Sequence, residues 1–435
     1  MPARLSRMDR RIIGLALPAL GALIVEPLYT LTDTAIVGHL GSAPLDGLAL
    51  ATTVLNLVGW TSAFLEMATT SRVAFRRARS DADGAAAAAT AAYALAVALG
   101  VVVGIVVAAA GPPIAHLLGG HGAIEHNATI YLRISAVGMP FLLLTFAGTG
   151  HLQGHEDTRT PLRIVLVANL VNVALEVVLV YAAHTGVAGS AWGTVVAQIV
   201  AAALFTRASR RRISRILTPR RAEVVVLLRN GLELVVRTIA LGAALVISTA
   251  VAAQVGSATL GGHQIALQVW ILLALTLDAL AVPAQVYVST ALGAGDVDDA
   301  VAVGARCLRL GLVVSVAVGV VTIVASPGLP YAFSSDGAVR SAATVALVIC
   351  GALQPLAALA FVYDGLLLGA GDYRTLRRVM LLALVAFAPL AAATLADHDL
   401  GIAGIWLALT CWLAARTLLL GARWRSRAWA LSPPS

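Results

Sequence analysis

Acidic and amide side chains inside long apolar runs are the groups of this sequence best suited to chemistry. Asp33 lies in the first apolar run, and Asn169, Asn172 and Glu176 lie in a later one. The i, i+3, i+7 spacing of the later group puts its members on one face of a helix. A carboxylate inside a membrane is expensive and by default marks a path for ions or protons. If these runs cross a membrane, the pattern predicts a shared cavity in which Asp33 and Glu176 bind a coupling ion, either H⁺ or Na⁺.

Other ionisable side chains in apolar runs are candidate cavity residues. Glu26 lies seven residues before Asp33 and shares its helical face. Glu233 and Arg237, spaced i, i+4, are expected to form an ion pair with each other. Asp364 lies near the predicted cytoplasmic end of its run, where water reduces the cost of a lone carboxylate. A packing role is the alternative for each of these groups. The candidate cavity residues are Glu26, Asp278, Asp364 and Arg237.

No residue pattern indicates catalysis, a metal or an organic cofactor. The three cysteines have no CxxC spacing and no histidine at ligand spacing, so they are expected to be core residues. The sequence GAGD at residues 293–296 lacks the lysine and the preceding strand of a phosphate-binding loop. We therefore expect no catalytic residue, no metal site and no cofactor besides the coupling ion. The cysteines are Cys307, Cys350 and Cys411.

The composition explains why these runs are treated as membrane spans. The chain has 435 residues, of which 59% are hydrophobic and 12% are charged, and its mean hydropathy is +0.89. Soluble proteins carry about 25% charged residues, so the charged side chains here are too few to cover a soluble fold. The composition excludes a soluble enzyme and a disordered chain, and it indicates a polytopic membrane protein.

Breaks in the apolar pattern predict an all-α fold with twelve transmembrane helices. A bilayer core requires about 20 helical residues, and each predicted span reaches that length. The first run follows several arginines, as a signal peptide does, but it is too long and contains carboxylates, so it is assigned as the first span. The predicted spans are residues 11–39, 45–73, 85–110, 127–153, 161–183, 187–207, 223–255, 260–288, 300–325, 338–368, 375–396 and 401–422.

The arginines predict the orientation of the chain. The net charge of +8 rests on thirty arginines, with no lysine. Arginines cluster after each even-numbered span, and positively charged loops lie on the cytoplasmic side of a membrane. Both termini are therefore predicted to lie in the cytoplasm, with the protein in the cytoplasmic (inner) membrane. The clusters lack interleaved stacking aromatics, so no nucleic-acid partner is expected.

An internal repeat divides the chain into two halves. The segment GSAPLDG at residues 41–47 recurs as GSATLGG at 256–262, an offset of 215. At the same offset, GHEDTRT at 154–160 recurs as GAGDYRT at 369–375. Because each half holds six spans, the halves share one orientation, as in many secondary transporters. We predict two six-helix lobes related by a parallel repeat. Their ranges are 1–206 and 223–435, joined by a cytoplasmic arginine-rich linker at 207–222.

The repeat also marks positions at which the two halves differ. At the offset of 215, Asp33 and Glu176 correspond to Ser248 and Ala391, so neither carboxylate has an acidic counterpart. Symmetry therefore gives these two side chains no structural reason to be acidic. The asymmetry favours a functional role for both.

Four runs of the sequence resemble the multidrug and toxic compound extrusion (MATE) family. In addition, Glu26–Pro27 ahead of Thr32–Asp33–Thr34 resembles its DinF-type branch. The resemblance covers essentially the whole chain and includes the two six-helix lobes. The runs are LALPALGALIVEPLYTLTDTAIVGHLG (15–41), GHEDTRTPL (154–162), NLVNVALE (169–176) and FVYDGLLLGAGD (361–372).

The resemblance implies a cation-coupled efflux transporter. In the DinF-type branch, the aspartate that matches Asp33 is the key proton-binding group, and residues that match Asn172 and Glu176 act with it. The proline that matches Pro18 is where the first helix is proposed to bend on protonation. A proline inside a helix cannot donate its backbone hydrogen bond, so a bend at that position is cheap.

Several positions depart from the family pattern. Glu176 replaces an aspartate, which keeps the charge on a longer side chain. Gln153 and Glu156 stand where an arginine and a glycine are usual, and residues 79–81 replace a Gly-rich turn. Glu66 stands where a small or apolar residue is usual. These departures bear on the substrate range more than on the fold.

We interpret the chain as a secondary active antiporter that exports amphipathic, cationic drugs or toxic metabolites in exchange for H⁺, with Na⁺ as the alternative ion. Its expected partners are these small molecules and membrane lipid, while substrate identity and oligomeric state stay open. A flippase for lipid-linked precursors is the main alternative, but its pyrophosphate cargo would favour intramembrane arginines, for which only Arg237 and Arg133 are candidates. An intramembrane enzyme is a remote alternative, because the nine histidines are scattered.

Overall fold

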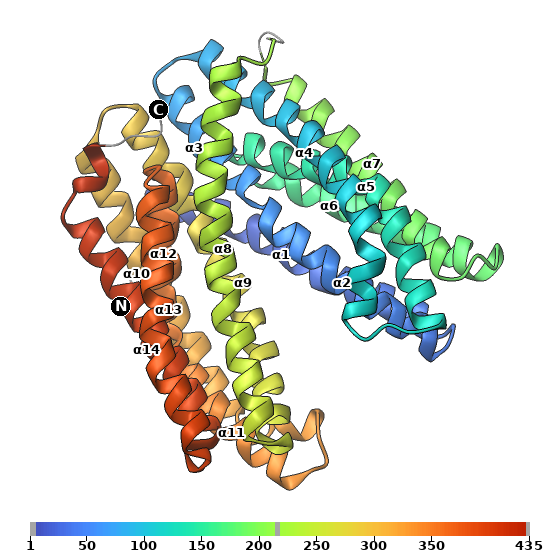
Figure 1. Ribbon diagram of the computed structural model, residues 1–435. Coiled ribbons are helices and arrows are strands. Elements are labelled where there is room, and N and C mark those ends of the chain that lie inside the picture. Colours follow the sequence, from blue (N-terminus) through green and yellow to red (C-terminus); the bar gives the residue numbers. More distant parts are fainter. Residues whose placement is uncertain (1–5, 214–217, 432–435) are drawn as a thin grey trace. The chain divides into compact units, whose positions relative to one another are not determined.

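The computed structural model describes residues 6–213 and 218–431, and helices dominate it (Figure 1). No β-strand occurs among these residues, so the predicted all-α class is confirmed. The helices of the first half are α1 (Arg7–Gly38), α2 (Ser42–Ser62), α3 (Phe64–Ala78), α4 (Ala82–Leu117), α5 (Ala123–Gly154), α6 (Arg159–Glu176) with the π-helical turn η1 (Val177–Ala182), and α7 (Val187–Arg210). Those of the second half are α8 (Arg221–Val255), α9 (Ser257–Gly293), α10 (Val297–Ala325), α11 (Gly337–Ala352), α12 (Gln354–Gly369), α13 (Tyr373–Ala396) and α14 (Gly401–Arg425).

The helices are long and apolar enough for a polytopic membrane protein. Eleven helical segments of the described chain could each cross a bilayer, and α11 with α12 is a twelfth if that bent pair is one span. The segments correspond one to one to the twelve predicted spans. Many large apolar side chains stay exposed on the helix surfaces, as contact with lipid requires. Examples are Ile105, Leu170, Val246, Val321 and Val385.

The predicted tenth span, residues 338–368, is a bent pair of helices instead of one straight helix. α11 and α12 meet at Leu353 with a bend of 52°. Pro355 lies in the first turn of α12. Because proline lacks a backbone donor and disfavours helical geometry in the preceding residue, it accounts for the break. The second predicted span is interrupted only at Ala63, between α2 and α3, and Ser42–Ala78 counts as one span.

The helices form two compact units. The first unit is Leu17–Gly231, and the second unit combines Met1–Ala16 with Leu232–Ser435. The boundaries between the units therefore fall inside α1 and inside α8. The predicted lobe limits, 1–206 and 223–435, stay a prediction. Of the predicted linker, residues 207–210 end α7 and residues 221–222 begin α8, while residues 214–217 lie outside the described chain. Residues 1–5 and 432–435 of the predicted lobes also lie outside it.

Each unit has its own buried core. In the first unit, Tyr131 and Leu132 of α5 pack with Leu48 of α2. In the second unit, aromatic side chains of α13 and α14 form the centre of the core, among them Phe387, Trp406 and Trp412. Small residues allow the helices of both units to approach closely, as is usual in membrane bundles.

Equivalent glycines make equivalent helix contacts in the two units. A Cβ atom added to Gly150 of α5 would lie 2.5 Å from the backbone oxygen of Glu66. A Cβ added to Gly365 of α12 would lie 2.5 Å from the backbone oxygen of Ala281. Both glycines and both contacts are related by the offset of 215. The same relation holds for Gly104 with Ala136 and Gly319 with Gly351, and for Gly47 with Asn127 and Gly262 with Ala342. The helix packing therefore repeats as the sequence does.

The helix starts are repeated as well. The Asp81 carboxylate accepts a hydrogen bond from the Gly84 N–H at 2.8 Å, and the Asp296 carboxylate accepts one from Asp299 at 2.8 Å. Each of these aspartates thereby caps a helix start, α4 or α10. Arg76 lies 2.9 Å from Asp81. Together with the Gly84 N–H it holds the pKa of the Asp81 carboxyl below its ordinary value.

Two departures from the family pattern occupy left-handed backbone positions. Ser80 has φ +59° and Glu156 has φ +60°. Their equivalents at the offset of 215 are Gly295 and Gly371, with φ +80° and +74°. Glycine adopts this conformation without the steric strain that a Cβ causes. Ser80 and Glu156 therefore strain the two turns of the first half, whereas Gly295 and Gly371 form the equivalent turns without that strain.

We predict that Gly150→Ala and Gly365→Ala each destabilise the protein by about 1–3 kcal/mol, since the added methyl group must displace backbone in a packed interface. The midpoint of thermal unfolding in detergent should fall for both variants. Gly242→Ala is the matched control, because a Cβ added to Gly242 in α8 meets no atom within 4 Å. An equal fall in the control would refute the role assigned to the close contacts.

Candidate functional site

Asp33 is buried in the first unit and is held by hydroxyl groups from two other helices. Its side chain, on α1, is 2% exposed. The Ser190 hydroxyl of α7 donates to Asp33 Oδ1 at 2.5 Å. The Tyr131 hydroxyl of α5 donates to Asp33 Oδ2 at 3.4 Å. These bonds connect α1 to α5 and α7 through a single carboxyl group.

Glu176 lies beside Asp33 and is fully buried, with 0% exposure. With the Asn172 amide turned so that its nitrogen faces Glu176, this nitrogen donates to Glu176 Oε1 at 2.6 Å, and the amide oxygen accepts from the Thr194 hydroxyl and backbone N–H, each at 3.2 Å. Glu176 Oε2 has no hydrogen-bond partner among the described residues. A Cβ at Gly193 would lie 3.0 Å from the Glu176 side chain, so this glycine leaves room for the longer acid.

The backbone after Glu176 changes from α-helix to the π-helical turn η1. The Tyr181 hydroxyl of that turn donates to the Ile36 carbonyl oxygen of α1 at 2.9 Å. Such π-helical turns occur often at functional sites. Here the turn gives α6 a second connection to α1, three residues after Asp33.

The residues selected from the sequence therefore separate into two groups. Asp33, Asn172 and Glu176 lie together in one buried cluster. Asn169 lies outside it, because its amide donates to the Val165 carbonyl oxygen of its own helix at 2.9 Å. Glu26 shares the α1 helix with Asp33, but its side chain is exposed. Pro18 and Pro27 both lie inside α1.

Four hydroxyl side chains of this site were missed by the sequence reasoning. Besides Ser190, Tyr131 and Thr194 they include Tyr29 of α1, whose hydroxyl lies 2.8 Å from the Thr194 hydroxyl. Serine, threonine and tyrosine are unremarkable in membrane helices, so their types alone carry no signal. The internal repeat could have identified them, because each of the four hydroxyl residues corresponds, at the offset of 215, to an apolar residue in the second half. The pairs are Tyr29 with Ala244, Tyr131 with Ala346, Ser190 with Ile405 and Thr194 with Leu409.

The second unit buries a different cluster, made of opposite charges. Asp364 of α12 is 3% exposed, and its Oδ2 forms an ion pair with Arg237 of α8. The same oxygen lies 3.2 Å from Arg416 Nη2 of α14, which is 1% exposed. The Arg416 guanidinium also lies 5.0 Å from the ring centre of Phe361. Asp278 of α9 is exposed and lies within Coulombic range of Arg237 and Arg416.

This cluster corrects two expectations. The predicted ion pair between Glu233 and Arg237 is wrong: Glu233 pairs instead with Arg377 at 2.8 Å, and Arg237 pairs with Asp364. The expectation that Asp364 is a lone, hydrated carboxylate is also wrong, because it is buried between two arginines. Arg416 was overlooked as an intramembrane charge. Contacts between distant helices decided both outcomes, and helical spacing could not predict them.

Glu66, which the sequence left without a partner, has one in the structure. Gln153 donates from its amide nitrogen to Glu66 Oε1 at 2.8 Å. Glu156, in the following turn, forms an ion pair with Arg77. Three departures from the family pattern, Glu66, Gln153 and Glu156, therefore have internal partners in the structure.

A group of potential metal ligands also escaped the sequence reasoning. His116, His121 and Glu125, around the turn between α4 and α5, have ligand atoms within 4.8 Å of one another. His116 Nδ1 lies 3.1 Å from Glu125 Oε2. The two histidines are exposed. One further expectation is wrong: Cys411 is exposed, although all three cysteines were expected in the core.

Two repeated bundles of long apolar helices, one of which buries two adjacent carboxylates without a basic partner among the described residues, are typical of membrane transporters. The MatE family model matches residues 18–178 and 235–393, and the chain belongs to this family of transporters. The resemblance stated from the sequence is thereby confirmed, and the family is one of transporters and not of enzymes.

Individual relatives match over almost the whole chain. Protein DETOXIFICATION 44, chloroplastic, from Arabidopsis thaliana is 30% identical over 97% of this chain and 82% of its own length. DNA damage-inducible protein F of Escherichia coli (strain K12) is 29% identical over 97% of this chain and 93% of its own length, in agreement with the DinF-type branch. The crystal structure of a MATE in the bent conformation has the same fold, with a TM-score of 0.90, 20% identity and coverage of 98% and 96% of the two chains.

We predict that Asp364→Asn destabilises the protein by about 3–5 kcal/mol, because it leaves two buried guanidinium groups without their counter-ion. Glu233→Gln is the matched control: it removes a charge whose partner Arg377 is about one-third exposed. Its cost should be about 1 kcal/mol or less. Thermal unfolding followed by tryptophan fluorescence measures both. Equal stability of the two variants would contradict the buried ion-pair assignment.

Proposed function

We propose that this MATE-family protein is an antiporter that exports amphipathic, cationic compounds in exchange for H⁺. The observation that carries the proposal is the buried pair of Asp33 and Glu176 in the first unit. Two adjacent carboxylates without a basic partner among the described residues are costly to ionise together in a low-dielectric site. Such a pair titrates as one coupled unit, and it is suited to taking up and releasing a proton.

The contacts of the pair indicate how protonation would be transmitted. An ionised Asp33 accepts strong, charge-assisted bonds from Ser190 and Tyr131, and these bonds weaken when the carboxyl gains a proton. Protonation would therefore loosen α1 from α5 and α7. Because Pro18 cannot donate a backbone hydrogen bond, α1 can bend there at low cost. We propose that α1 bends at Pro18 when Asp33 is protonated, and that this bend expels the substrate.

The choice of H⁺ over Na⁺ rests on the direction of the hydrogen bonds. Sodium, a hard cation, requires oxygen lone pairs that point toward it. The Ser190 and Tyr131 hydroxyls direct their protons at Asp33, and Asn172, with its amide turned as described above, directs its nitrogen at Glu176, so the two acids are the main oxygen ligands that a sodium ion would find here. Glu176 Oε2, without a partner among the described residues, is the position we propose for the exchanged proton.

The second unit offers little support for the flippase alternative. A pyrophosphate cargo would require free positive charge inside the membrane. Arg237 and Arg416 share the carboxylate of Asp364, and Asp278 lies within Coulombic range of both. Two acidic groups thus balance the two arginines. Because Asp364 already has its counter-ions, we also propose that ion exchange is confined to the first unit.

We place the protein in the cytoplasmic membrane with both termini in the cytoplasm, following the distribution of arginines. Reporter fusions at Arg79, at Arg212 and at the C-terminus should all report a cytoplasmic position. A signal from the opposite side at Arg212 would require an odd number of spans in the first half. That result would overturn the proposed topology.

We predict that Asp33→Asn reduces proton-coupled efflux to the level of protein-free vesicles while the protein still folds, because the amide keeps the shape but cannot exchange a proton. Glu176→Gln should cause a partial loss, since it removes one member of the pair. Asp46→Asn, an exposed aspartate on α2, is the matched control and should transport normally.

The measurement is efflux of a fluorescent cation from proteoliposomes, with a pH gradient and a Na⁺ gradient imposed separately. Transport driven by the pH gradient alone supports H⁺ coupling, and transport driven by Na⁺ alone rejects it. Wild-type activity in both Asp33→Asn and Glu176→Gln would remove these residues from the coupling mechanism.

A further inference from the structure

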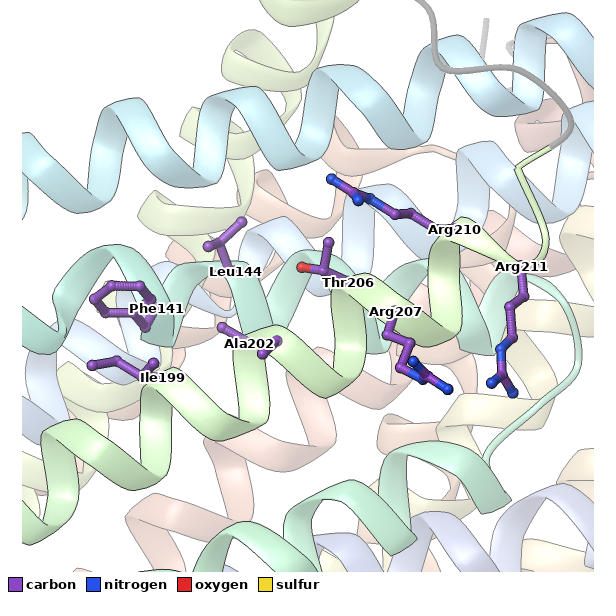
Figure 2. A pocket seen from close by; sticks show the side chains of 9 residues that line it. Phe141, Leu144, Ile199, Ala202, Thr206, Arg207, Arg210 and Arg211 are labelled. Carbon is purple, nitrogen blue, oxygen red and sulfur yellow. The ribbon is translucent and has the colours of Figure 1, made fainter.

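A long groove lies between α5 and α7 of the first unit, away from the buried carboxylates. Its volume is about 670 Å³. In Figure 2 its side chains run from Phe141 and Ile199 at one end, past Leu144 and Ala202, to Thr206 and a group of arginines at the other end. The groove is therefore apolar along most of its length and strongly basic at one end. The basic end consists of Arg207, Arg210 and Arg211.

The three arginines of the groove are free to bind an external anion. Arg207, Arg210 and Arg211 are exposed, and none has an acidic side chain within ion-pair distance among the described residues. The neighbouring Arg212 differs, because it lies 2.5 Å from Asp157. Three unneutralised charges within about one turn of helix repel one another and attract phosphate.

Helix packing holds the groove open. Gly148 of α5 approaches α7 so closely that an added Cβ would lie 2.6 Å from Phe205 Cβ. Gly138 of α5 makes a similar approach to Gln198 and Val195 of α7. The two helices are thereby fixed by buried contacts. Small side chains such as Ala203, which is exposed, leave space beside them.

We propose that this groove binds one anionic phospholipid, with its phosphate at the basic end and an acyl chain along the apolar side chains. Basic pockets between membrane helices on the cytoplasmic side are known to suit anionic headgroups, and on the proposed topology this end of α7 faces the cytoplasm. The volume greatly exceeds that of a few water molecules, each of about 30 Å³. The three positive charges exclude a cationic substrate.

The test uses the full chain, reconstituted in vesicles of phosphatidylcholine containing a minor fraction of phosphatidylglycerol and then extracted in mild detergent. Native mass spectrometry measures the phosphatidylglycerol that stays bound. Arg207→Gln combined with Arg210→Gln should weaken this binding by about 25-fold, since each arginine near an anionic headgroup contributes about five-fold. The matched control combines Arg159→Gln with Arg163→Gln, two exposed arginines of α6 that do not line the groove.

A second pair of variants tests the apolar part without changing any charge. Ala203→Trp fills the groove and should displace phosphatidylglycerol, whereas Val137→Trp, at an exposed position of α5 outside the groove, should not. Circular dichroism melting tests whether each variant is folded. If the double arginine variant of the groove does not fold, the single variant Arg207→Gln is used in its place.

The outcomes separate lipid binding from simpler explanations. Equal losses in the two arginine pairs would show non-selective attraction to a basic surface and would overturn the proposal. Retention of phosphatidylglycerol by Ala203→Trp would also overturn it, because the acyl chain would then lie elsewhere. Displacement by inorganic phosphate alone would show a headgroup site for free anions and reject the lipid. Selective loss in both groove variants supports the proposal.

Discussion

The cost of burying charge in an apolar medium governs this structure more than any other interaction. Only 12% of the residues are charged, and the buried ones in the two clusters have specific partners. A carboxylate or guanidinium removed from water must be neutralised, hydrogen-bonded or protonated. The two units meet this requirement in different ways, and the difference accounts for their different proposed roles.

In the second unit, the requirement is met by opposite charges. Asp364 is bound by Arg237 and Arg416, which come from three different helices in all. Charges arranged in this way stabilise one another permanently, and their removal one at a time leaves an uncompensated charge. The cluster therefore connects α8, α12 and α14, and it has no need of an exchangeable ion.

In the first unit, two acids lie side by side, and hydroxyl and amide groups are their direct hydrogen-bond donors. Hydrogen bonds alone stabilise one charge, but they do not remove the repulsion between two. This is why we propose that the site takes up a proton from outside the protein. The helices of the two units pack in the same way, because equivalent glycines make equivalent close contacts in both. Function is thus assigned to positions at which a symmetric scaffold carries asymmetric side chains.

The sequence by itself determined the helical membrane class, the spans, the repeat and the shared helical face of Asn172 and Glu176, because hydropathy, helical period and a constant offset are properties of the linear chain. That Asp33 lies beside Glu176 was a prediction that only the tertiary structure could test. The tertiary structure alone decided that Arg237 pairs with Asp364 instead of Glu233, and that Ser190 and Tyr131 bind Asp33. It also decided that Arg416 is buried and that three arginines at the end of α7 border a groove. Helical spacing identifies residues that share a face, but the partner of a side chain depends on which helices pack against that face, and this is set by the fold as a whole.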